Sequence, residues 1–576
     1  MLVSKDNYQR VVEDLATKPI LACDTETSGL EHTDRLFAII LADDTNEYYF
    51  DKRILGSMIS DPRGLGYLLF DTHLIFQNAK FDMAMLEREG LPVNKVSDIA
   101  VLARLVRNDH LSYKLDDQAK RYGMAKSTLV ERYIKEHKLY SERTTYLGEK
   151  YKSPQFDKVP IEIMQVYACH DARLTYDLYH IYMKEIPSES LAIWETEQQL
   201  TPILYNMEKR GVQLDIAGTL KAREYEMGLI LEAKERFRSM SGYNYDENNR
   251  KTLIEVFTKA GESFEYTDKG NPRIDKDALE TFHSPIAAVV REIRYYEKRV
   301  STYYDSFLNY SDSRGVIHAR INQGGTTTGR FSYADPNLQN IPKEDSEADS
   351  AKPYVVRGCL VPKPGYYFVS IDYSQQEYRM MLDYANEKRM IEQVMSGVDV
   401  HQATADLLGI TRKYAKTVNF AALYGAGPDK LAGMLGLSVF EARRLLDRYF
   451  MGLPMVEQFV DRVRQTAKGR GYIRNWAGRR LHCQPGFDYA MPNHLIQGGC
   501  SDVVRKAMVA LKDAPIILQI HDQLVFEVPL YTTKQEIMVW KDIMESVYES
   551  KNGMKLTADV SISMKSFAER DMQVLK

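Results

Sequence analysis

The sequence has 576 residues and a formal net charge of −4, with 44% hydrophobic and 27% charged residues. This composition is typical of a soluble globular chain of roughly three or four domains, and it excludes a uniformly basic nucleic-acid binder. No apolar run reaches the ~18 residues of a membrane span, so we expect no membrane segment and no signal peptide. The five cysteines form no C-x-x-C pair, which indicates a reducing compartment, and we expect a cytoplasmic protein.

The first third of the chain carries four carboxylates and a tyrosine in three short patterns. A predicted strand ends at Asp24, and side-chain alternation puts Glu26 on the same face as Asp24. Asp82 lies in a helix that follows a second predicted strand. Tyr167 and Asp171 lie four residues apart on a predicted helix over 163–183, so they also share a face. Each pattern alone is more often a solvated turn or surface, so only the complete set indicates a site.

Long helices are predicted after residue 189. One is expected over 191–209, and another begins with Ser284 as its N-cap and Pro285 at its first helical position. Apolar residues continue at helical spacing to Phe307. A charged helix face is usually only solvated, but contact with phosphates is the alternative that we favour here. The cations on the other faces of this helix are Arg291, Arg294, Lys298 and Arg299.

Two aspartates follow predicted strands in the second half of the chain. The apolar run 368–371 ends at Asp372. Two later runs, 516–520 and 523–528, predict a hairpin with Asp522 at its tip. A single Asp at a strand end is usually a turn residue. Two aspartates on adjacent strands, however, can hold two divalent metal ions about 3.5–4 Å apart, the arrangement that serves phosphoryl transfer.

A predicted helix over 411–423 carries an unusual stripe of side chains. Arg412, Lys416, Phe420 and Tyr424 are spaced by four, so they lie along one face. Two cations followed by two aromatic rings suit neither a core nor a solvated surface. They suit a nucleotide, whose phosphates need cations and whose base needs an aromatic surface.

These motifs together resemble those of family A (DNA polymerase I-like) DNA polymerases. D-Y-S-Q-x-E-x-R at 372–379, R-x3-K-x2-N-F-x3-Y-G at 412–425 and H-D at 521–522 have the order and spacing of that family's catalytic motifs. The segments T-x-x-G-R and D-P-N-L-Q-N-I-P within 324–342 match it as well. The set D-x-E, N-x2-F-D and Y-x3-D resembles the 3′–5′ exonuclease domain of proofreading polymerases.

The resemblance implies an α/β and α+β multidomain fold, in which a ribonuclease-H-like exonuclease domain precedes a right-hand polymerase. The expected domains are the exonuclease domain at 1–188, the thumb at 189–325, the first part of the palm at 326–400, the fingers at 401–485 and the second part of the palm at 486–576. It also implies Mg²⁺ as cofactor, with two ions per active site and Mn²⁺ as a substitute.

Residue roles follow from the same resemblance. Asp372 and Asp522 would hold the metal ions for synthesis, and Lys416 would protonate the leaving pyrophosphate. Tyr167 would orient the water that attacks at the nuclease site, whose metal ligands would be Asp24, Glu26, Asp82 and Asp171. The expected nucleotide contacts are Glu377, His401, Arg412, Lys416, Phe420 and Tyr424. The expected DNA contacts are Arg330 in the minor groove, Asn337, Gln339, Asn493, Gln497, His521 and Lys298.

Several alternatives stay open at the level of sequence. Phe81 suits core packing and the nuclease site equally well. Gln523 stands where relatives commonly have glutamate, and an amide is a poor candidate for a metal ligand. A single-subunit RNA polymerase is disfavoured because Glu377 would block a 2′-hydroxyl, and an inactive binding protein is disfavoured because all the metal carboxylates are present.

The expected partners are primer-template DNA and dNTPs, with a helicase and a single-strand-binding protein as candidate accessory proteins. We expect a monomer without a membrane contact and without a 5′ nuclease domain. The compact layout resembles phage replicative enzymes, which would act in the host cytoplasm, while a bacterial or organellar origin stays open.

Overall fold

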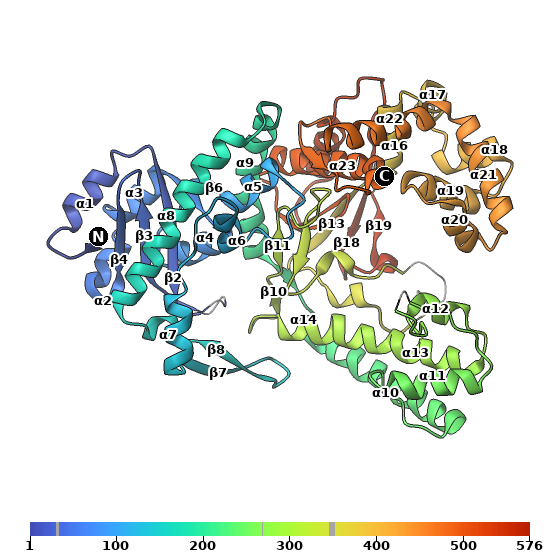
Figure 1. Cartoon of the computed structure of the whole chain (residues 1–576), viewed down its shortest axis with the longest axis horizontal. Helices are drawn as coiled ribbons and strands as arrows, with labels where there is room; N and C mark the ends of the chain where they lie inside the picture. The colour runs from blue at the N-terminus through green and yellow to red at the C-terminus, as the bar shows by residue number, and fades with distance from the viewer. Residues whose placement is uncertain (30, 32–33, 268, 345–351, 576) are drawn as a thin grey trace.

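The computed structural model describes residues 1–29, 31, 34–267, 269–344 and 352–575. Two sheets organise the described chain, one of six strands near the N-terminus and one of five strands in the centre (Figure 1). Helix α9 (Leu191–Arg210) runs between them and contacts β6 of the first sheet and β16 of the second. Among the helices of the described residues, none is long and apolar enough to cross a membrane.

The N-terminal sheet is mixed, with the strand order β1-β4-β3-β2-β5-β6. Strand β3 (Leu36–Ala42) is buried throughout because Ile40 faces one hydrophobic core while Ile39 and Leu41 face another. Helix α8 (Ile161–Glu185), which confirms the helix predicted over 163–183, packs across β2, β3 and β4. The other elements of this part are β1 (Leu2–Val3), β2 (Ile20–Thr27), β4 (Glu47–Asp51), β5 (His73–Phe76), β6 (Lys95–Asp98), the hairpin β7 (Tyr140–Thr144) and β8 (Lys150–Pro154), α1 (Tyr8–Leu15), α2 (Lys52–Leu55), α3 (Leu65–Asp71), α4 (Ala79–Arg88), α5 (Ile99–Val106), α6 (Leu115–Arg121) and α7 (Leu129–His137).

A helical arm, residues 216–309, extends from the centre of the molecule (Figure 1). Its helices α10 (Ile216–Ser241) and α13 (Pro285–Arg299) pack along each other. The predicted cap of α13 is confirmed, because the Ser284 side chain accepts a hydrogen bond from the Ala287 backbone N–H. Helix α13 continues through a π-helical segment, Val300–Asp305, into α14 (Ser306–Asn309). Helices α11 (Arg250–Lys259) and α12 (Lys276–Thr281) lie near the tip of the arm. At the base of the arm, β9 (Val212–Gln213) pairs with β10 (Val316–Ile317).

The cations predicted for phosphate contact on α13 have different surroundings. Arg299 is buried and bonds Glu226, with N–O distances of 2.9 Å from Nε to both carboxylate oxygens. Arg291 donates to the Phe282 carbonyl at 3.0 Å, and Arg294 pairs with Glu247 at 2.8 Å. The expectation is therefore wrong for Arg299, whose charge is used inside the arm. Lys298 is the exposed member of the four.

The central sheet is antiparallel and has the order β16-β17-β13-β18-β19. Strand β13 (Tyr366–Tyr373) lies in its middle, as the apolar run 368–371 predicts. The predicted hairpin is confirmed as β16 (Ile516–Ile520) and β17 (Gln523–Pro529). The other elements of this part are β11 (Arg320–Asn322), β12 (Ser332–Ala334), β14 (Tyr472–Arg474), β15 (Arg480–His482), β18 (Ala558–Ser563), β19 (Gln573–Val574), α16 (Gln376–Ala385), α22 (Pro454–Arg470), α23 (Met491–Ala510) and α24 (Lys534–Ser546).

An outer helical lobe, residues 388–452, lies beyond the central sheet (Figure 1). The helix predicted over 411–423 is confirmed as α19 (Arg412–Leu423), with Thr411 as the N-cap that accepts from the Tyr414 N–H. The other helices of the lobe are α17 (Lys388–Met395), α18 (Val400–Leu408), α20 (Pro428–Leu435) and α21 (Val439–Gly452).

The buried pair in the arm generates a stability prediction. Replacing Arg299 with alanine leaves the Glu226 carboxylate buried and unpaired, which should cost roughly 3–5 kcal/mol. The matched control is Arg236→Ala, which breaks the more exposed pair with Glu292 on the same two helices and should cost less than about 1 kcal/mol. Hydrogen exchange of the α10 and α13 amides measures both local opening free energies. Equal effects of the two variants would contradict the role given to the buried pair.

Candidate active sites

One cavity of about 320 Å³ opens beside the end of strand β13. It is lined by residues of α16, α18, α19, α23, the β16–β17 turn and the loop that carries Arg330, which come from distant parts of the sequence. Seven of the predicted site residues are among them: Arg330, Glu377, His401, Phe420, Tyr424, His521 and Asp522.

Asp372 and Asp522 lie at neighbouring strand ends. In the β13–β17 ladder Asp372 is opposite Gln523, and the Tyr373 N–H donates to the Asp522 carbonyl at 3.3 Å. Burial and the charge of Asp372 raise the pKa of Asp522 to about 8, and burial also raises the pKa of Asp372. Asp522 therefore holds a proton at neutral pH, and a divalent cation would take the place of that proton. Hard carboxylate oxygens suit Mg²⁺.

Two further residues beside this pair bear on metal binding. Asp559 of β18 lies directly opposite Asp372 in the ladder, and its charge also raises the pKa of Asp372. Gln523 is buried and its amide donates to the Ser370 hydroxyl. The Gln523 amide nitrogen is thus bonded within the sheet, whereas its Oε1 is buried without a hydrogen-bond partner.

Glu377 connects two other predicted residues across the cavity. Arg330 pairs with its Oε1, and the Tyr424 hydroxyl donates to its Oε2 at 3.0 Å. Arg330, predicted to contact DNA, and Tyr424, predicted to contact the nucleotide, are thus both bonded to Glu377 in this structure.

The predicted stripe on α19 is present along one face. Arg412 forms a two-pronged ion pair with Asp399, with distances of 3.0 and 2.9 Å. Lys416 is exposed one turn further on. The rings of Phe420 and Tyr424 are stacked, with centroids 6.1 Å apart and planes at 10°.

His401 is held beside this stripe by a residue of α19 to which we gave no role from sequence. The Asn419 amide bonds His401 Nδ1 at 2.9 Å, and the Asn419 carbonyl oxygen accepts from the Thr404 hydroxyl at 3.0 Å. Burial lowers the pKa of His401. A neutral imidazole in a fixed orientation follows from these contacts.

The predicted DNA contacts fall into different environments. Asn493 and Gln497 lie one turn apart on α23, in line with Ser501 of the cavity, and Asn493 Oδ1 is a buried acceptor without a hydrogen-bond partner. Gln339 differs from expectation, because its side chain is buried and donates to Gln519 at 2.7 Å. Asn337 is exposed and accepts from the Gln339 backbone N–H.

A second group of predicted residues gathers at the N-terminal sheet. Asp24 and Glu26 both lie within β2, which runs on to Thr27 instead of ending at Asp24 because it pairs with β3 there. Asp82 is in the first turn of α4, where it accepts from the Thr25 hydroxyl at 2.7 Å. Tyr167 and Asp171 come from α8. The four carboxylates and the tyrosine are brought together as predicted.

The carboxyl groups of this cluster have raised pKa values. Burial and Asp171 raise the pKa of Asp24 to about 7, and burial with neighbouring carboxylates raises the pKa of both Glu26 and Asp82. Asp171 Oδ1 is buried and has no hydrogen-bond partner. The carboxylates outnumber the cations in this cluster, so oxygen-seeking Mg²⁺ fits it.

Lys126 enters this cluster without any signal in the sequence. Its ammonium lies 2.8 Å from Asp171 Oδ2 and 5.0 Å from the centroid of the Tyr167 ring. The Tyr167 hydroxyl bonds Glu131 of α7 at 3.3 Å. Within the described ranges, no three Asp, Glu, His or Cys side chains are arranged as they stand to hold a metal ion, so ion binding here requires the side chains to adjust.

The chain belongs to DNA polymerase family A, because the model of that family matches residues 221–569. A 3′–5′ exonuclease family model matches residues 1–187. The predicted fold class, an exonuclease domain followed by a family A polymerase domain, is thereby confirmed.

Individual relatives agree with this assignment. DNA polymerase I of Pseudomonas aeruginosa is 30% identical over 83% of this chain and 54% of its own length, and that of Chloroflexus aurantiacus is 29% identical over 82% and 52%. The chain spans about half the length of these bacterial relatives. DNA polymerase DpoZ of Salmonella phage PMBT28 is 27% identical over 87% of this chain and 89% of its own length.

A solved structure has the same fold. The POL domain of Pol1 from M. smegmatis, in complex with DNA primer-template and dNTP, superposes with a TM-score of 0.83. The match covers 98% of this chain and 99% of that chain at 24% sequence identity.

The raised pKa of Asp522 predicts a pH-dependent affinity for divalent cations. Below about pH 8 the metal-free pair holds a proton that an ion must displace, so the affinity should rise by up to about ten-fold per pH unit and level off above pH 8. Calorimetric Mg²⁺ titrations across pH measure it, in a variant whose four N-terminal carboxylates are alanine. In the same background, Asp372→Asn removes one cause of the shift, so the midpoint should move to lower pH. An unchanged midpoint would contradict the coupling.

Proposed function

We propose that this protein synthesises DNA from dNTPs on a primed template and trims DNA 3′ ends at a second, separate site. The single observation that carries the proposal is the convergence of Arg330, Glu377, His401, Phe420 and Tyr424 on one cavity beside the two half-buried aspartates. The match of residues 1–187 to a 3′–5′ exonuclease family supports the second activity.

In the proposed synthesis the primer 3′-hydroxyl attacks the α-phosphate of the bound nucleotide, and pyrophosphate leaves. Arg412 exchanges its Asp399 partner for the triphosphate, and Lys416, one turn away, binds the same group and protonates the leaving pyrophosphate. The neutral imidazole of His401 donates a hydrogen bond to a phosphate oxygen. Metal ions held by Asp372 and Asp522 would activate the attacking oxygen and stabilise charge on the leaving one.

The remaining cavity residues select the nucleotide. Phe420 lies against the sugar, Tyr424 next to the template base, and Glu377 where a 2′-hydroxyl would enter. Arg330 reaches the minor groove of the terminal base pair. Acceptors there are nearly the same for every correct pair, so this contact tests the geometry of the pair without reading its sequence.

In the proposed trimming reaction, water attacks the terminal phosphodiester and the 3′ oxygen of the penultimate nucleotide leaves. Tyr167 orients that water with its hydroxyl. Asp24, Glu26, Asp82 and Asp171 would hold the metal ions. The work of the protein at this site is to bind an unpaired 3′ end and to hold the carboxylates in one place.

The biological setting is also a proposal. We infer genome replication of a phage, because DNA polymerase DpoZ of a Salmonella phage is among the relatives that match most of this chain. Primer-template DNA and dNTPs are the proposed ligands, with Mg²⁺ as cofactor, and replicative accessory proteins are the proposed partners.

Separate sites predict separable activities. Asp24→Ala with Glu26→Ala should abolish 3′ trimming and leave primer extension intact, because these residues lie on a different sheet from Asp372. Asp372→Ala should abolish extension and leave trimming intact. The measurement is the length distribution of a labelled primer with and without dNTPs or rNTPs. Continued degradation of single-stranded DNA by the Asp24/Glu26 double variant would refute the assignment of the nuclease site.

The placement of Phe420 predicts discrimination against chain terminators. Phenylalanine has no hydroxyl to replace the missing 3′-hydroxyl of a dideoxynucleotide, so partners of that group stay unpaired at a cost of about 1–3 kcal/mol. Phe420→Tyr should fill the gap and raise dideoxynucleotide use by roughly ten-fold or more. The readout is the ratio of kcat/KM for ddNTP and dNTP in the Asp24/Glu26 double variant.

A matched control is Tyr424→Phe, which removes a hydroxyl from the neighbouring ring and should leave the ddNTP/dNTP ratio unchanged. Equal ratios for wild type and Phe420→Tyr would mean that the ring does not face the sugar.

A further inference from the structure

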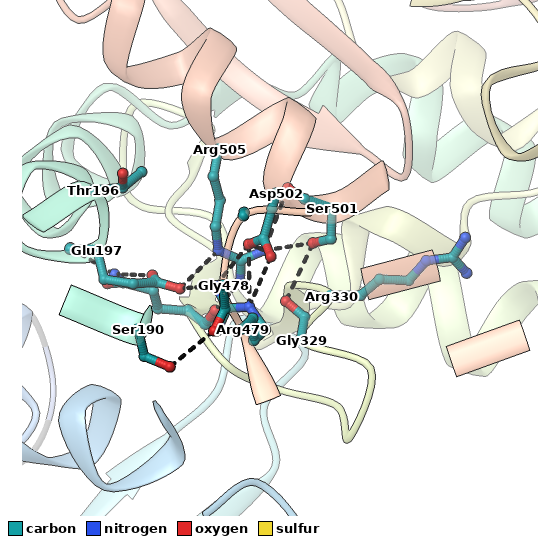
Figure 2. Close-up of polar contacts among 12 residues, drawn as sticks. Ser190, Thr196, Glu197, Gly329, Arg330, Gly478, Arg479, Ser501, Asp502 and Arg505 are labelled. Atoms are coloured by element: carbon teal, nitrogen blue, oxygen red, sulfur yellow. Dashed lines mark hydrogen bonds and ion pairs between the residues drawn. The ribbon is translucent and has the colours of Figure 1, made fainter. Parts of the chain in front are cut away.

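A buried ion network lies behind the cavity and joins three segments of the chain (Figure 2). Arg479, which precedes β15, bonds Asp502 of α23 at 2.7 Å and also pairs with Glu197 of α9. Arg505 lies one turn along α23 from Asp502, and its Nε is 3.0 Å from Glu197 Oε1. Two cations and two carboxylates thus neutralise one another.

The network is built for the protein interior. Its four residues are 5% exposed or less, and Arg505 and Asp502 are fully buried. Charged groups are kept away from water at a cost of several kcal/mol per ion unless they are fully paired. The Asn475 amide satisfies a further lone pair of Asp502 at 2.6 Å. Arg505 Nε has no hydrogen-bond partner and contacts Glu197 only as an ion pair. The remaining ion pairs and hydrogen bonds fix the relative positions of α9, α23 and the turn before β15.

The same residues also hold the loop between β11 and β12, residues 323–331. Arg505 donates to the Gln323 carbonyl at 2.6 Å, and the Gln323 amide donates to Glu197 at 2.7 Å. Arg505 also bonds the Ser501 hydroxyl, which in turn donates to the Gly329 carbonyl at 3.2 Å. The loop backbone is therefore bonded to the network at both of its ends.

The fit at Gly329 is close. Its φ of +83° is a conformation that favours glycine, and a β-carbon there would lie 3.2 Å from Cδ of Arg479. The Arg330 side chain leaves the loop directly after this point and extends away from the network in Figure 2, to reach Glu377. The direction of Arg330 is thus set by backbone that the network holds.

We propose that Glu197, Arg479, Asp502 and Arg505 are positioning residues for Arg330, and that they fix its reach to the minor groove of the terminal base pair. The inference rests on the proposed function, which gives Arg330 that contact. These four residues touch neither DNA nor nucleotide in this assignment. They act by holding the loop backbone, with Ser501 as the link between Arg505 and Gly329.

The test uses a primer that lacks the acceptor which Arg330 would bind. In the Asp24/Glu26 double variant, kcat/KM for adding one dNTP is measured on primers that end in guanine or in 3-deazaguanine, which has no minor-groove N3. A lost charged hydrogen bond should make wild-type extension about ten-fold or more slower on the analogue. Arg330→Ala should be insensitive to the change. Glu197→Gln and Ser501→Ala should move the ratio of the two primers toward one.

The control is Glu226→Gln, which removes one charge from the similarly buried ion pair with Arg299 on helices α10 and α13 of the arm. It should keep the wild-type primer ratio even if it lowers stability, so a general loss of folding cannot imitate the expected result. Ser501→Ala removes no charge and carries the test if Glu197→Gln does not fold. Wild-type primer ratios in both Glu197→Gln and Ser501→Ala would overturn this inference but leave the proposed Arg330 contact in place. A wild-type enzyme that is insensitive to 3-deazaguanine would overturn the proposed Arg330 contact and, with it, the inference.

Discussion

Antiparallel pairing of β13 with β17 brings Asp372 and Asp522 together, and both carboxylates are largely withdrawn from water. Hydrogen bonds of the ladder fix the two strand ends, so the repulsion between the two aspartates is reduced by the proton that Asp522 holds below about pH 8. Burial makes that repulsion larger than it would be at a surface. The result is a site that is electrostatically incomplete without a cation, while the buried apolar residues of the sheet supply the stability that keeps it so.

Helix α9 gives the two proposed activities a common support. On one side it packs against helix α4 and against β6, a strand of the sheet that bears Asp24 and Glu26. Toward the centre it contacts β16 and supplies Glu197 to the network behind the cavity. Asn108, from the part matched by the exonuclease family, adds a second connection, because it bonds both the Thr327 carbonyl and the His482 N–H. The two sites share no side chains, but α9 and Asn108 connect the parts of the structure that carry them.

Local patterns predicted the elements that carry the sites. The apolar run before Asp372, the hairpin at Asp522 and the cap at Ser284 each depend on neighbouring residues, so they could be predicted from the sequence. Contacts between distant segments could not. Asp559 opposes Asp372 only because β18 pairs with β13 in one register, and no periodicity reveals that Lys126 reaches Asp171.

The same limit explains the expectations that changed. Arg299 lies on a charged helix face, but packing of α13 on α10 buries it against Glu226. Gln339 belongs to a motif expected to contact DNA, yet its side chain is buried and its amide donates a hydrogen bond to Gln519 of β16.

The hydrogen bond from Tyr424 to Glu377 has a thermodynamic consequence for any ligand that takes the place of Tyr424. Such a ligand binds only the fraction of molecules in which this bond is open. Its measured dissociation constant is therefore the intrinsic constant divided by that fraction. A closed form favoured by about 1.4 kcal/mol would weaken apparent binding roughly ten-fold for correct and incorrect nucleotides alike. The bond would thus lower the affinity for such ligands without changing the ratio of their affinities.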